Sequence, residues 1–101
     1  MDEKVIKKII TRAKRIVKLE DEIETLIDEM GEFGSEKFAL MRANMQVDHW
    51  NIPKLKAMFP DMTIKVEETG TTNLYHINMV VDGVPFYEFT IGDYAKEFMN
   101  E

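Results

Sequence analysis

The sequence contains no cysteine, one tryptophan, three prolines and five glycines among its 101 residues. Without cysteine the chain can form neither a disulfide framework nor a thiolate zinc site, and it has no thiol nucleophile. No apolar run approaches the roughly 20 residues of a membrane-spanning helix, and the charged N-terminus lacks the apolar stretch of a secretory signal. We therefore expect a soluble, cytoplasmic protein that makes no membrane contact.

Side chains that could carry catalysis are also scarce. Ser35 stands where a helix N-cap belongs, and His49 lies in a run (48–50, Asp-His-Trp) whose neighbouring side chains point in different directions. His76 lies on an expected strand with only Asn78 beside it, short of the three or four ligands that zinc requires. The sequence thus predicts no enzyme, no catalytic or metal-ligating residue and no cofactor.

The residues that are present suffice for a folded domain. Hydrophobic residues make up 45% and aromatic residues 10% of the chain, which is enough apolar material for a core. At this length we expect one domain over residues 1–101.

Residues 3–30 are predicted to form a long amphipathic helix, because apolar residues recur there with helical period and no glycine or proline interrupts them. Some of these residues repeat every seven positions, which implies a supercoiled seam with a partner helix. The expected dimer seam consists of Val5, Ile9, Ile16, Leu19, Ile23, Leu26 and Met30. An alternative is a helix broken near residue 20, with Asp21 as a second N-cap and Glu24 at the third position. Gly31 is placed to end the helix in the left-handed conformation.

The remaining chain changes from helical to alternating periodicity after Pro60. A second helix from Ser35 to about residue 47 and a short turn opened by Pro53 make a helical segment over 35–60. Residues 62–91 are expected to form a three-stranded antiparallel sheet, followed by a short helix at 93–100. The predicted fold is α+β, with the long N-terminal helix and the second helix packed on this three-stranded meander.

The Asp82-Gly83 pair is the strongest turn signal, since both residues tolerate the positive φ of a two-residue hairpin turn. Such a turn fixes the register of the strands that flank it. Val81 then faces Val84, Met79 faces Phe86, Ile77 faces Glu88, and on the other face Val80 faces Pro85, Asn78 faces Tyr87 and His76 faces Phe89.

The net charge of −6 conceals a strong segregation of charge along the chain. Residues 1–18 carry a balance of +5, residues 19–36 carry −8 with no basic residue, and the rest carries −3. The expected partner-binding residues belong to the acidic block and are Glu20, Asp21, Glu22, Glu24, Asp28, Glu29 and Glu32. In size and charge the chain resembles phage and mobile-element inhibitors, including anti-CRISPR proteins. That resemblance implies a small acidic regulator or inhibitor that binds a protein partner.

Two further readings follow from the same charges. The basic residues could follow a nucleic-acid backbone, and this alternative rests on Lys4, Lys7, Lys8, Arg12, Arg15 and Lys18. The acidic block and the overall negative charge oppose it, because they repel nucleic acid at long range. A basic first half and an acidic second half also make the helix complementary to an antiparallel copy of itself, so we expect a homodimer.

Overall fold

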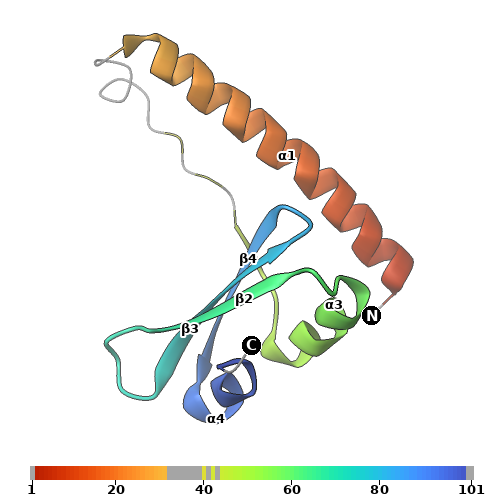
Figure 1. Ribbon diagram of the computed structural model, residues 1–101, viewed down its shortest axis with the longest axis vertical. Helices are drawn as coiled ribbons and strands as arrows, with labels where there is room; N and C mark the ends of the chain where they lie inside the picture. The colour runs from red at the N-terminus through yellow and green to blue at the C-terminus, as the bar shows by residue number, and fades with distance from the viewer. Residues whose placement is uncertain (1, 32–39, 41, 43, 100–101) are drawn as a thin grey trace. The chain divides into compact units, whose positions relative to one another are not determined.

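A computed structural model describes residues 2–31, 40, 42 and 44–99 (Figure 1). Its contacts divide the chain into two compact units, Met1–Ala43 and Asn44–Glu101, and each is described by itself. The single domain expected over 1–101 therefore stays a prediction. None of the helices in the described part is long and apolar enough to cross a lipid bilayer.

The first unit is dominated by one continuous helix, α1 (Glu3–Glu29) (Figure 1). Asp2 caps its start, with a side-chain oxygen that accepts the Lys4 backbone N–H at 2.9 Å. Gly31 follows its end with φ of +79°, as the C-cap prediction requires. The unbroken helix is confirmed, and the alternative with a break near Asp21 is wrong: the backbone carries on through that residue without a new cap.

The helix predicted from Ser35 to about residue 47 lies partly outside the described residues, and its end is wrong. Met45–Gln46 form a short strand, β1, which runs parallel to β4 (Val84–Ile91). The Val47 N–H continues the pairing and donates to the Tyr87 carbonyl at 3.1 Å. A strand edge offers unpaired backbone donors and acceptors, and here this pairing outweighs local helix propensity.

The second unit contains a four-stranded mixed sheet in the order β1-β4-β3-β2, with β2 at Thr63–Glu68 and β3 at Leu74–Val81. The α+β class is confirmed, but the predicted count of three strands is wrong because β1 joins the edge. The hairpin register is confirmed at every predicted pair, from Val81 opposite Val84 to His76 opposite Phe89. Asp82 and Gly83 both have positive φ, +51° and +83°, as the predicted turn demands.

Short helices complete this unit and supply part of its buried core. The 3₁₀ turn η2 (His49–Asn51) leads into α3 (Ile52–Met58), and β4 leads into α4 (Gly92–Ala95) and η3 (Lys96–Phe98). These elements correspond to the predicted Pro53 turn and the predicted last helix. The core residues are Ile52, Leu55, Met62, Ile77, Met79, Val81, Val84, Phe86, Ala95 and Phe98. The other face of the hairpin leaves Val80, Phe89 and Ile91 exposed.

Candidate functional site

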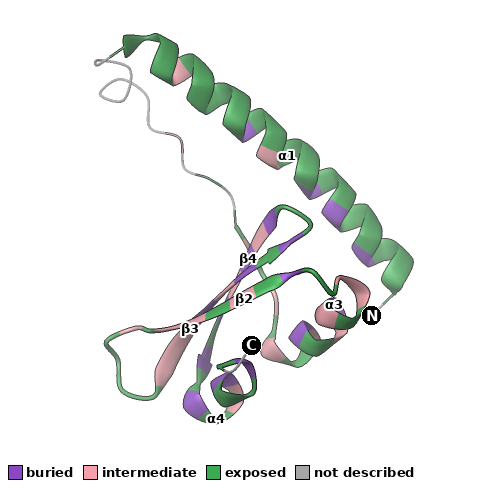
Figure 2. Cartoon of the chain, in the orientation of Figure 1, coloured by how far each residue is buried: buried purple, intermediate pink, exposed green. Residues whose placement is uncertain are grey.

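The predicted dimer seam of α1 is exposed along its whole length. Its seven residues, spaced at heptad positions from Val5 to Met30, each keep between 44% and 61% of their surface accessible. Most of α1 is coloured as exposed (Figure 2). The buried apolar residues Ile6, Ile10 and Ala13 form a separate stripe, roughly a third of a turn around the helix. The helix therefore carries two apolar stripes, and the heptad one is uncovered.

The predicted acidic residues do not form one uniform surface. Glu20 is only 8% exposed, unlike the other described residues of this set. Glu32 lies outside the described residues. Glu22, Asp28 and Glu29 are exposed, as expected. Asp21 and Glu24 are exposed as well but have a basic neighbour within the same unit.

That neighbour is Arg42, which the sequence analysis did not place. Its Nη2 lies 2.6 Å from Asp21 Oδ1 and 2.5 Å from Glu24 Oε2, and its Nε donates to Glu24 Oε1 at 3.1 Å. The hydrogen bonds from Arg42 lower the pKa of Glu24, and those to Glu24 and Asp21 raise the pKa of Arg42. The pairing cancels part of the negative charge on this side of α1, where Asp28 lies exposed one turn beyond Glu24.

The six basic residues of the nucleic-acid alternative are all exposed. Lys4, Lys7, Lys8, Arg15 and Lys18 share one side of α1, and Arg12 falls in the companion row of the heptad seam. The seam is thus interrupted by one charge, at the position between Val5 and Leu19 in that row.

A polar and aromatic cluster in the second unit joins η2 to β4. Glu88 is buried, and its carboxylate accepts the His49 backbone N–H at 2.8 Å, the Gln46 amide at 2.9 Å and the Phe89 backbone N–H at 3.0 Å. The His49 ring stacks on Tyr94 with centroids 4.3 Å apart, and Trp50 meets Tyr94 edge-on at 5.0 Å. The carboxylate accepts three hydrogen bonds, two of which hold the β1–η2 segment against β4.

This cluster lines a shallow hollow of about 470 Å³, with Trp50 68% exposed at its rim. Sequence reasoning missed Glu88, although the predicted register had already placed it beside Ile77 on the buried face. It also missed Tyr94, which no local pattern connects to His49.

The two histidines do not converge. His76 stacks on Phe89 at 4.5 Å, beside Tyr87, on the sheet face opposite Glu88. In the part of the chain that the structure describes, no three His, Asp or Glu side chains are grouped to hold a metal ion.

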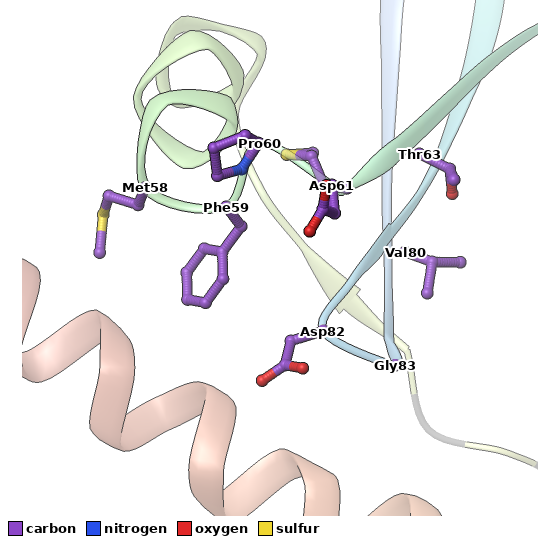
Figure 3. A pocket seen from close by; sticks show the side chains of 9 residues that line it. Met58, Phe59, Pro60, Asp61, Thr63, Val80, Asp82 and Gly83 are labelled. Carbon is purple, nitrogen blue, oxygen red and sulfur yellow. The ribbon is translucent and has the colours of Figure 1, made fainter.

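A second hollow, of about 460 Å³, lies where the end of α3 approaches the β3–β4 turn (Figure 3). Phe59, Pro60 and Asp61 line it from one segment and Val80, Asp82 and Gly83 from the other. This mixture of one ring, one proline and two carboxylates has no convergent donors for a small ligand.

Comparison with known proteins gives no match: no protein family, no curated protein and no solved structure resembles this chain closely enough to be assigned. The exposed seam, the paired acidic residues and the basic side of α1 are therefore the features from which function must be argued.

Proposed function

We propose that the chain is a non-enzymatic interaction module that pairs with a second copy through α1 and binds a protein partner through acidic side chains. The observation that carries this proposal is the exposure of all seven seam residues. Monomeric proteins rarely leave a large apolar patch in water, and Arg12 is the one charge within this seam. On a heptad repeat, such a surface is typical of a helix that pairs with another helix.

The partner-binding part of the proposal uses the side of α1 away from the seam. Asp21 and Asp28 lie there one heptad apart, with Glu24 between them. Arg42 forms ion pairs with two of these carboxylates, those of Asp21 and Glu24. We propose a partner with a basic groove, which an acidic phage- or mobile-element-type inhibitor could occupy in place of a polyanion.

Pairing is tested by a pull-down experiment. A tagged and an untagged copy of the chain are expressed together, and the untagged copy that stays bound to the tagged one is measured. The wild-type chain should retain its copy, and Leu26→Glu should not, because the substitution places a charge in the seam. Thr25→Glu is the matched control, since it adds the same charge one residue away on the exposed side. Equal retention by all three chains would contradict the proposed pairing.

Partner recognition is tested with the double substitution Asp21→Lys and Asp28→Lys. Proteins that the wild-type chain captures from a cell lysate should be lost with this variant, while its pairing with a second copy persists. A captured protein that binds both chains equally does not use the acidic side, and the partner-binding proposal would then be wrong.

Nucleic-acid binding is the alternative, and the exposure of all six basic residues favours it. It predicts binding to duplex or single strands that weakens steeply with salt. Neutralising Lys7 and Arg15 should reduce that binding. No shift of either nucleic acid in a low-salt gel would exclude this alternative.

A further inference from the structure

We infer that the occupant of the α1 seam is a second copy of this chain that runs antiparallel and in one particular register. The inference rests on the proposed function, because it specifies how the two copies pair. Written as a heptad, Ile9, Ile16, Ile23 and Met30 occupy position a. Val5, Arg12, Leu19 and Leu26 occupy position d, and all eight side chains are exposed.

The seam residues of two copies lie level with one another when the second helix runs antiparallel to the first. In an antiparallel pair, each a residue packs level with a d residue of the other helix. One register makes four kinds of layer, in which the two residue numbers always add to 35. These layers place Val5 with the partner's Met30, Ile9 with the partner's Leu26, Arg12 with the partner's Ile23, and Ile16 with the partner's Leu19.

The charges beside the seam select this register. Position g, directly before each a residue, holds Lys8, Arg15, Glu22 and Glu29, all exposed. In an antiparallel pair, g residues meet g residues of the other helix across the seam. The register above brings Lys8 to the partner's Glu29 and Arg15 to the partner's Glu22, so each contact joins opposite charges.

Neighbouring antiparallel registers are disfavoured by like charges. A shift of seven residues in one direction would bring Arg15 against the partner's Arg15. The same shift in the other direction would bring Glu22 against the partner's Glu22. Each shift would also leave seam residues at the helix ends unpaired, so the loss of apolar burial and the repulsion act together.

The parallel arrangement is disfavoured by the one charge in the seam. In a parallel pair, d residues face their own copies, so two Arg12 guanidinium groups would meet between apolar layers. The antiparallel register places Arg12 beside the partner's Ile23 instead, one residue from the partner's Glu22. Its long stem can then cover the seam while its head reaches that carboxylate and water.

Cysteine cross-linking tests the orientation, because the native chain contains no cysteine. Two single variants, Ile9→Cys and Leu26→Cys, are oxidised separately and as a mixture. In the antiparallel register, identical positions lie about 25 Å apart, beyond the reach of a disulfide. We therefore expect a cross-linked dimer from the mixture alone. Cross-linking of each variant with itself would show a parallel pair and overturn the inference.

The outcomes separate this inference from the proposed function. A monomeric wild-type chain in sedimentation equilibrium would overturn both the antiparallel register and the proposed pairing through α1. A dimer that forms no disulfide in the mixture would overturn the register and leave pairing through α1 to be judged by Leu26→Glu.

Charge exchange gives a second measurement that does not depend on cysteine. Glu22→Arg should raise the dimer Kd roughly tenfold, because two attractive contacts become repulsive. Adding Arg15→Glu to the same chain should restore the Kd. Asp28→Lys, which changes charge away from the seam, serves as the control. A double variant that stays as weak as the single one would contradict the pairing of Arg15 with the partner's Glu22.

Discussion

The β3–β4 hairpin and α1 are both rich in aliphatic side chains, but they bury these side chains to different extents. In the hairpin, Ile77, Met79, Val81 and Val84 are all at most 2% exposed. In α1, the seven seam residues keep nearly half or more of their surface in contact with water. Alternation in the hairpin sends apolar residues to the face that the chain buries, whereas the heptad of α1 sends them to a face that the chain leaves open. This difference in burial is the observation on which the proposed pairing of α1 with a second copy rests.

The largest expected effect is the loss of pairing when a charge enters the seam. Ile16→Glu removes an apolar layer at the centre of the seam and forces a carboxylate to be desolvated there. In sedimentation equilibrium, we expect this variant to have the monomer mass of 11.8 kDa at concentrations where the wild-type chain pairs. Thr11→Glu, an exposed position off the seam, should leave pairing intact. An Ile16→Glu variant that still pairs would show that the seam is not the interface.

The second-largest effect is expected on the free energy of unfolding, in the buried core of the hairpin. Ile77→Ala should lower the free energy of unfolding by about 2–5 kcal/mol, because it leaves a cavity in the hairpin core. Val80→Ala, on the exposed face of the same strand, should lower it by well under that amount. Urea unfolding followed by circular dichroism measures both. Equal losses would mean that the two faces of β3 are not as different as their exposure indicates.

A smaller effect is expected at the buried carboxylate of Glu88. Glu88→Gln replaces one acceptor oxygen by an amide group that faces N–H donors, which should cost about 1–3 kcal/mol. The single tryptophan, Trp50, lies beside His49 and Tyr94, so its fluorescence should also change. Glu67→Gln, on the opposite face, is the control. If both variants unfold at the same urea concentration, Glu88 does not fasten the β1–η2 segment.

The smallest effect is the titration of Glu24. Arg42 lowers the pKa of this carboxyl, so their attraction is present at neutral pH and is lost as pH falls through the lowered value. In an NMR titration, Glu24 should titrate below the ordinary range of a glutamate. Arg42→Gln should return the pKa of Glu24 toward that range. If the substitution leaves the pKa of Glu24 unchanged, Arg42 and Glu24 do not form this ion pair in solution.

Local patterns predicted much of this structure. The helical period of apolar residues over 3–30, which no glycine or proline interrupts, predicted α1. The Asp82-Gly83 pair with its alternating flanks predicted the hairpin and its register. In both cases the signal lies within a few residues of the element that it specifies, so tertiary contacts had little to override.

Contacts between distant residues were missed for physical reasons. Strand β1 has two residues, too few for any periodicity, and it pairs with residues some forty positions away. Arg42 lies 18 positions from Glu24 and 21 from Asp21, so no local sequence pattern connects it to them. Glu88 is different, because the predicted register already placed it on the buried face of the hairpin. It was overlooked because carboxylates are usually exposed to water.

The molar mass of the wild-type chain, measured by light scattering through a dilution series at low and high salt, decides most directly whether α1 pairs with a second copy. The proposed pairing predicts twice the chain mass of 11.8 kDa, with dissociation on dilution that salt promotes modestly, since apolar layers hold the pair and charges orient it. A mass of 11.8 kDa at every concentration and both salts would contradict it, because the exposed seam would then have no second copy to cover it.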